Sequence, residues 1–222
     1  MSSTDVDALA AAVLETCRTA GLMVAPAASC TGGLIAGALP EVAGSSDGVG
    51  RGFVTYSNEA KQTLLGVPAG LFDKVGAVSE EVARAMAEGA VARSKAQLAV
   101  SVTGIAGPGG GTETKPVGLV YMAIAREGLE TSHFRDVFPG DRSEVRTATV
   151  VVPRGVSMTV RNGRMSPSSP YTRILHGVLS GPCHSSMSAS SGRPSVLRTT
   201  WTCSTDGERY DQVRSEPPWT RM

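Results

Sequence analysis

The sequence predicts a three-layer α/β/α sandwich with a mixed sheet in roughly the first 150 residues. Apolar residues there recur at the spacing of amphipathic helices or in short runs typical of buried strands. Two strand candidates run directly into Gly-rich loops, and the last two are joined by a short turn. Alternating helices and strands favour parallel neighbours with helices on both faces, whereas a closing hairpin adds antiparallel ones.

The domain is predicted to begin with a helix, because apolar residues from Val6 to Cys17 fall on one helical face. Gly21 suits the C-terminal cap of this helix. Residues 22–28 are short and apolar, as in a buried strand, and lead into residues 29–33, which combine hydroxyl side chains with two glycines. A second helical run follows this loop.

The middle of the domain continues the alternation. Residues 50–57 are a strand candidate and residues 58–65 a helix candidate. Ser79 is a suitable N-cap for a helix that runs to about Ser94, since two glutamates occupy its first turn. Residues 97–103 form a third apolar run, so a third strand is expected there.

The domain is predicted to close with an antiparallel hairpin. Residues 117–125 and 131–138 are the two predicted strands, and residues 126–128 supply the turn. Asp141 and Glu144 then form the pattern of a capping box, which predicts the start of another helix.

The composition changes near residue 150. Residues 151–222 contain nine arginines, four acidic residues and no lysine, a net charge of +5, whereas the 12 basic and 16 acidic residues of 1–150 give −4. The tail lacks periodicity and is rich in Ser, Pro and Arg, which favours disorder. Pro153 and Gly155 interrupt a helix that has just begun, so a change of reading frame is the preferred explanation. The alternative is a natural Arg/Ser-rich extension.

Composition also excludes several classes of protein. No apolar run approaches the ~20 residues that span a bilayer, and the N-terminus lacks the features of a signal peptide, so a cytoplasmic protein is expected. The four cysteines form no CxxC pair, which disfavours zinc sites and disulfide frameworks. No histidine precedes residue 130, so a Ser-His-Asp triad would lack its base.

Two features could bind phosphate. The loop 29–33 offers hydroxyls and close backbone where a helix begins, which suits an anion. It matches no known phosphate-loop fingerprint, and such a loop is more often only a tight turn. Arg142, at the start of another helix, could bind phosphate through two hydrogen bonds, or be an ordinary surface arginine.

Lys61 is the candidate base. Without histidine, a serine nucleophile such as Ser46 needs a neutral lysine to accept its proton. Lowering a lysine pKa by about 3 units costs roughly 4 kcal/mol, which burial or a neighbouring cation can supply. From spacing alone, a solvated lysine and a turn serine are the more common reading.

Taken together, the ordered motifs resemble the C-terminal domain of the CinA family, the nicotinamide mononucleotide deamidases. The resemblance covers residues 5–150, and so many matches in order are highly specific. The matching stretches are residues 27–33, 44–46, 52–61, 65–67, 76–80, 102–110, 115–118 and 138–142.

The resemblance implies that nicotinamide mononucleotide and water give nicotinic acid mononucleotide and ammonia. It implies a serine nucleophile and a lysine base, assigned here to Ser46 and Lys61 with assistance from Tyr56, and Ser29 is the rival nucleophile. It further implies a homodimer that needs no metal or other cofactor. Substrate would be held by Ser29, Thr31, Gly32, Gly33, Thr103 and Gly104, with Arg142 on its phosphate.

Two departures from the family pattern leave a second function open. The family usually has Glu where this chain has Ala28, and its closing helix is interrupted here. A catalytically weak nucleotide-binding module is therefore the alternative. A nucleic-acid arm in the tail is disfavoured because its arginines are scattered, and no membrane partner is expected.

Overall fold

The structure is a computed structural model that describes residues 3–151 and five short strands of the tail. The chain divides into two compact units, Met1–Leu175 and His176–Met222, which are described separately. The expectations of disorder and of a frame change in the tail lie largely outside the described residues. The tail strands are β6 (Val160–Arg161) and β7 (Arg164–Met165), which pair, and β8 (His184–Met187), β9 (Arg198–Thr202) and β10 (Arg209–Val213), which form a second small sheet.

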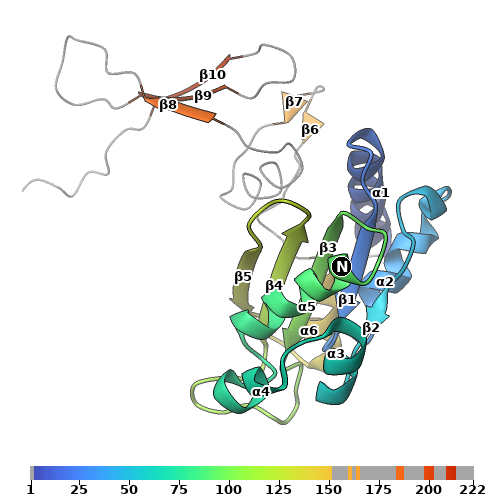
Figure 1. The fold of residues 1–222 in the computed structure, drawn as a ribbon, viewed down its shortest axis with the longest axis vertical. Coiled ribbons are helices and arrows are strands. Elements are labelled where there is room, and N and C mark those ends of the chain that lie inside the picture. The colour runs from blue at the N-terminus through green and yellow to red at the C-terminus, as the bar shows by residue number, and fades with distance from the viewer. Residues whose placement is uncertain are drawn as a thin grey trace, which may run out of the picture. The chain divides into compact units, whose positions relative to one another are not determined.

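The first unit is built on a mixed five-stranded sheet (Figure 1). The strand order is β2-β1-β3-β4-β5, with β1 parallel to both β2 and β3 and with β3, β4 and β5 antiparallel in turn. The predicted mixed sheet and closing hairpin are therefore confirmed. The strands are β1 (Val24–Ala28), β2 (Phe53–Val54), β3 (Leu98–Gly104), β4 (Leu119–Arg126) and β5 (Ser132–Val137).

Helices cover both faces of this sheet. One group lies in front of it in Figure 1, where α5 packs on β1, β3 and β4 and is flanked by α3 and α4. The other group, in which α1, α2 and α6 contact one another, touches the sheet through α2 and β1. The helices are α1 (Ser3–Thr19), α2 (Leu34–Ala38), α3 (Asn58–Leu65), α4 (Ala69–Val75), α5 (Glu80–Ala92) and α6 (Arg142–Val151).

The core lies around β1, all five residues of which are buried. Ala25 and Ala27 pack in one cluster with Val82 and Met86 of α5. Because side chains alternate along a strand, Val24, Pro26 and Ala28 face the opposite helical layer. A parallel strand covered on both faces explains why the predicted strand is apolar without alternation.

Strand β2 is shorter than the predicted strand 50–57, and Pro26 gives the reason. The N–H of Val24 donates to the Gly48 carbonyl and the Ala28 carbonyl accepts from Thr55, so alternate residues of β1 point towards the β2 side. Pro26 lies between them and has no N–H to donate. Pairing is therefore confined to Ala27 and Ala28.

The helix signals were mostly correct. Ser57 and Ser79 cap α3 and α5 through their hydroxyls, and Gly66 ends α3 in the left-handed conformation. The predicted capping box is confirmed, since Asp141 and Glu144 exchange hydrogen bonds between side chain and backbone N–H. Helix α4 was not predicted. In the part of the chain that the structure describes, no helix has the length and hydropathy needed to cross a membrane.

Candidate functional site

A cavity of about 180 Å³ lies where β1, β2 and β3 end. The carboxyl ends of parallel strands in α/β sheets are where ligands usually bind. Of the predicted site residues, this cavity brings together six. Its walls are Ser29, Cys30, Tyr56, Asn58, Lys61, Ala77, Val78, Thr103, Gly104, Ala106 and Arg142.

Lys61 is the most unusual residue of the cavity. It lies on the buried face of α3 and is only 1% exposed. Its Nζ donates to the carbonyls of Thr55 at 2.9 Å and Tyr56 at 3.3 Å. Burial lowers the pKa of Lys61, and proximity to Cys30 acts weakly the other way. A neutral amine has two N–H donors, which these carbonyls would occupy, so its lone pair remains to accept a proton.

Tyr56 and Arg142 join two walls of the cavity. Arg142 donates through Nη2 to the Tyr56 hydroxyl at 2.9 Å and through Nη1 to the Gly107 carbonyl at 2.9 Å. The ring of Tyr56 is 62% exposed. This arginine therefore fixes the position of the tyrosine hydroxyl across the mouth of the cavity.

Two side chains with nucleophilic atoms, Ser29 and Cys30, follow β1 directly and line the cavity with Lys61. Both are more than nine-tenths buried. Burial raises the pKa of the Cys30 thiol to about 11, so at neutral pH it is protonated and a poor nucleophile. Ser29 and Cys30 would therefore each need a base such as Lys61 to act as a nucleophile.

The wall opposite β1 is held by hydrogen bonds to its backbone. The Thr103 hydroxyl donates to the Ala77 carbonyl at 2.8 Å. Lys115 donates through Nζ to the carbonyls of Val75 at 2.6 Å and Val78 at 2.7 Å. Thr103, predicted to hold substrate, thus also orders the loop that faces it.

Ser46 is not among the residues that line this cavity, so its expected pairing with Lys61 stays a prediction. It is exposed and lies in a short 3₁₀ turn, Ser45–Asp47. Gly48, which follows this turn, accepts a hydrogen bond through its carbonyl from the N–H of Val24 at the start of β1. Lys61 and Ser29 lie beyond the other end of β1. Five strand residues span about 16 Å, so Gly48 and Ser29 lie near opposite ends of β1.

The loop Thr31-Gly32-Gly33 also lies outside the cavity walls. The helix that follows it, α2, has only five residues, so its dipole adds little to the predicted anion site, which stays a prediction. Thr31 is fully buried, its Oγ1 has no hydrogen-bond partner among the described residues, and its carbonyl accepts from Arg146 Nη2 at 3.1 Å.

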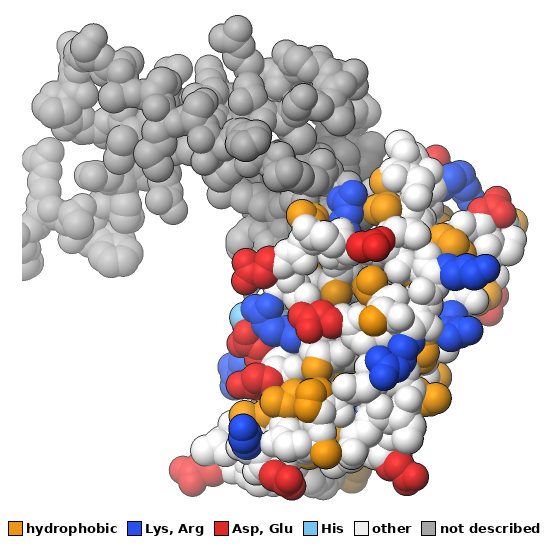
Figure 2. Space-filling model, in the orientation of Figure 1, with side chains coloured by type: hydrophobic (Ala, Val, Ile, Leu, Met, Phe, Trp, Pro, Cys, Tyr) orange, Lys and Arg blue, Asp and Glu red, His pale blue; other side chains and the backbone are white. Residues whose placement is uncertain are grey.

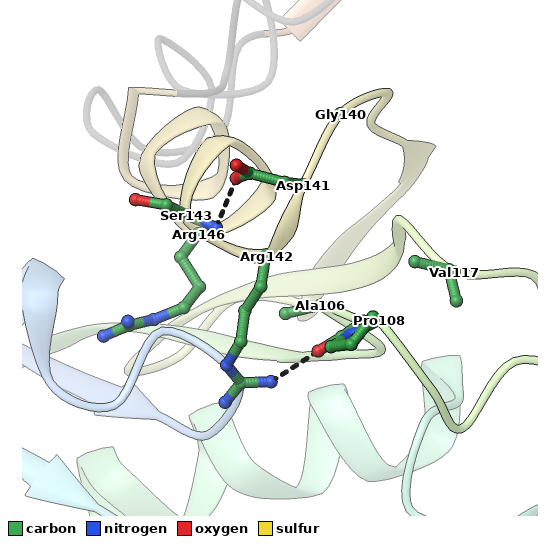
Figure 3. Close-up of a pocket in the computed structure, with 9 residues that line it drawn as sticks. Ala106, Pro108, Val117, Gly140, Asp141, Arg142, Ser143 and Arg146 are labelled. Atoms are coloured by element: carbon green, nitrogen blue, oxygen red, sulfur yellow. Dashed lines mark hydrogen bonds between the residues drawn. The ribbon is translucent and has the colours of Figure 1, made fainter.

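A wider hollow of about 600 Å³ adjoins the cavity and shares Ala106 and Arg142 with it. Figure 3 shows the side chains of Arg142 and Arg146 extending from α6 into this region. The hollow is lined by Ala106, Gly107, Pro108, Val117, Gly140, Asp141, Arg142, Ser143 and Arg146.

Sequence reasoning missed several of these residues. Cys30, Ala77 and Val78 line the cavity beside predicted residues, and Arg146 lies one helical turn after Arg142. A spacing of four residues after a predicted helix start was a usable signal for Arg146. Where the structure describes the chain, no group of three or more His, Cys, Asp or Glu residues could hold a metal ion.

Comparisons with known proteins agree with this fold. A family model described as the CinA C-terminal domain matches residues 6–153. A CinA-like protein of Geobacter sulfurreducens is 53% identical over 141 residues, which is 63% of this chain and 34% of the relative. A competence-damage inducible protein of Caldicellulosiruptor bescii is 54% identical over 129 residues, 58% of this chain and 31% of the relative.

Solved structures match at similar levels. The competence/damage inducible protein CihA from Agrobacterium tumefaciens is 51% identical, with a TM-score of 0.65 over 66% of this chain and 90% of that one. A CinA superfamily protein from Escherichia coli is 34% identical, with a TM-score of 0.64 over 68% of this chain and 88% of that one. The chain spans about a third of the length of the curated relatives it matches.

Proposed function

Because the chain belongs to the CinA C-terminal domain family, we propose that it hydrolyses the carboxamide of nicotinamide mononucleotide to nicotinic acid mononucleotide and ammonia. The substrate comes from the resemblance of the motifs. The amidase chemistry is supported by one observation above the others: a buried lysine, which forms no ion pair with a carboxylate among the described residues, lines the same small cavity as a serine.

The proposed reaction uses two residues in turn. Ser29 Oγ attacks the carboxamide carbon while Lys61 Nζ accepts its proton. Collapse of the tetrahedral intermediate breaks the C–N bond, and Lys61 returns the proton to the leaving nitrogen as ammonia departs. Water, deprotonated by Lys61, then attacks the Ser29 ester and releases the acid, so serine and lysine are regenerated.

Ser29 replaces Ser46 as the proposed nucleophile because of position. Ser29 follows β1, which ends at the cavity. Ser46 lies two residues before Gly48, whose carbonyl accepts a hydrogen bond from Val24 at the start of β1. Tyr56, fixed by Arg142, would orient the substrate at the mouth.

The assignment is tested by ammonia release from nicotinamide mononucleotide. Replacing Ser29 by Ala or Lys61 by Met is expected to lower kcat on the order of 10³-fold or more, whereas Ser46→Ala should change it less than about twofold. Loss of turnover in Ser46→Ala, with Ser29→Ala active, would move the nucleophile back to Ser46.

Ala28 favours a second candidate, a nucleotide-binding module with little catalysis. Ala28 is fully buried beside the loop that carries Ser29, and the missing carboxylate could be one that orients the site. Binding of the mononucleotide without ammonia release would support this alternative.

A further inference from the structure

The hollow beside the cavity has the chemistry of an anion site. Arg142 and Arg146 are four residues apart on α6, so their side chains leave the same face of the helix (Figure 3). Like charges at this spacing repel and destabilise a helix unless something compensates for them. No carboxylate within the described residues forms an ion pair with either arginine.

The hydrogen bonds of these arginines leave several donors unused. Arg142 donates to the Tyr56 hydroxyl and the Gly107 carbonyl, and Arg146 to the Thr31 carbonyl. Arg146 Nε is buried and has no partner among the described residues. Guanidinium groups donate five hydrogens, and phosphate oxygens are well matched to pairs of them.

The acidic residues at the start of α6 do not neutralise this site. Asp141 Oδ1 accepts from the backbone N–H of Ser143 at 2.8 Å and Glu144 at 2.9 Å, and Glu144 Oε2 accepts from Asp141 at 2.8 Å. These bonds occupy N–H groups at the helix start, so the arginines, and not the helix terminus, would bind an anion.

The surrounding charge makes the site selective. Residues 1–150 carry a net charge of −4, and the face in Figure 2 shows acidic and basic side chains spread among one another. Arg142 and Arg146 both border the wider hollow. A local positive potential inside an acidic domain attracts anions specifically to this position.

We propose that Arg146, with Arg142, binds the phosphate of the substrate in the wider hollow. This inference rests on the proposed function and adds the location of the phosphate. The carboxamide then lies between Ser29 and Lys61, and Arg142 stands at the junction of the two hollows. The phosphate then lies under α6, close to the Thr31-Gly32-Gly33 loop, because Arg146 Nη2 also donates to the Thr31 carbonyl at 3.1 Å.

The test compares nicotinamide mononucleotide with its dephosphorylated riboside in the full chain. Arg146→Ala is expected to lower kcat/KM for the mononucleotide at least tenfold, mainly through KM, and to leave kcat/KM for the riboside within twofold. For Arg146→Lys, kcat/KM for the mononucleotide should lie between the values for the wild type and for Arg146→Ala, because lysine retains the charge but lacks the paired donors. Arg18→Ala removes an exposed arginine of α1 and serves as the matched control.

Direct titration with inorganic phosphate separates this inference from the proposed function. If no variant releases ammonia, the proposed function fails, yet phosphate should still bind the wild type at least fivefold more tightly than Arg146→Ala. Equal phosphate binding by the two proteins, or equal losses for mononucleotide and riboside in a folded Arg146→Ala and Arg146→Lys, would overturn the phosphate site.

Discussion

A buried lysine makes pH the most direct probe of single residues in this site. Burial lowers the pKa of Lys61, so its neutral form, the proposed base, is populated at lower pH than in an exposed lysine. We expect kcat/KM to rise with pH through this lowered pKa and then level. A pH–rate profile without such a rise between pH 5 and the usual lysine pKa of about 10.4 would contradict the assignment.

The same residue links pH to stability. Because the folded pKa lies below the unfolded one, the unfolded chain binds more protons between the two values, so stability should rise with pH over that interval. Lys61→Met should remove this dependence and raise the thermal midpoint at neutral pH, since no charge is then buried. Lys74→Met, at an exposed lysine of α4, is the control and should change neither the pH dependence of stability nor the thermal midpoint.

Ala28 is expected to limit activity. Its side chain faces the layer that contains α6, where Arg146 Nε and Thr31 Oγ1 have no hydrogen-bond partner in the part of the chain that the structure describes. A glutamate at this position would supply an acceptor and hold Arg146 in place. Ala28→Glu should raise kcat/KM by roughly tenfold, equivalent to about 1.4 kcal/mol, and Ala28→Gln by less. Unchanged ammonia release in a folded Glu variant would show that this position does not tune the site.

The sequence predicted which types of residue line the cavity better than it predicted which individual residues lie close together. Lys61, Tyr56, Thr103 and Arg142 line one cavity, as expected from their places after strands or at a helix start. Ser46 does not, because spacing along the chain cannot tell whether a turn returns to the beginning or the end of a strand. That distinction depends on the Val24–Gly48 hydrogen bond, which joins segments far apart in sequence.

At the level of elements, local signals predicted most of the fold. The caps of α3, α5 and α6 were readable because each involves residues within one turn of the helix. Strand β2 was overestimated because its length depends on a proline in a neighbouring strand. Helix α4 was missed because Pro68 precedes seven residues that contain a glycine and no polar N-cap.

The capping box of α6 provides a test at this scale. Asp141→Ala removes two hydrogen bonds to the first turn and should cost about 1 kcal/mol of stability, roughly 2–4 °C in the thermal midpoint. Because the next residue is Arg142, KM for the mononucleotide should also rise. Asp141→Asn retains a capping side chain and should lose less. A thermal midpoint of Asp141→Ala equal to that of the wild type would show that the cap contributes nothing.

For the whole molecule, the open edge of the sheet suggests how two copies could associate. β2 is the last strand on its side, and its Val54 is 50% exposed. Leu34 of α2 is 41% exposed, and a Cβ added to the preceding Gly33 would lie only 3.1 Å from Cγ2 of Val54. Exposed apolar side chains beside an unpaired edge favour association with another chain. We therefore propose that two copies of this chain associate through this edge to form a homodimer.

This arrangement predicts a specific loss of assembly. The double variant Leu34→Lys, Val54→Lys should shift the mass measured by light scattering from dimer to monomer, because two charges per chain would be buried at the contact. Leu64→Lys, on α3 and 48% exposed, is the matched control and should leave the dimer intact. Tyr56 follows β2 directly and lines the cavity, so dissociation should also raise KM. A dimer that persists in the double variant, or a wild type that is monomeric at every concentration, would rule out this interface.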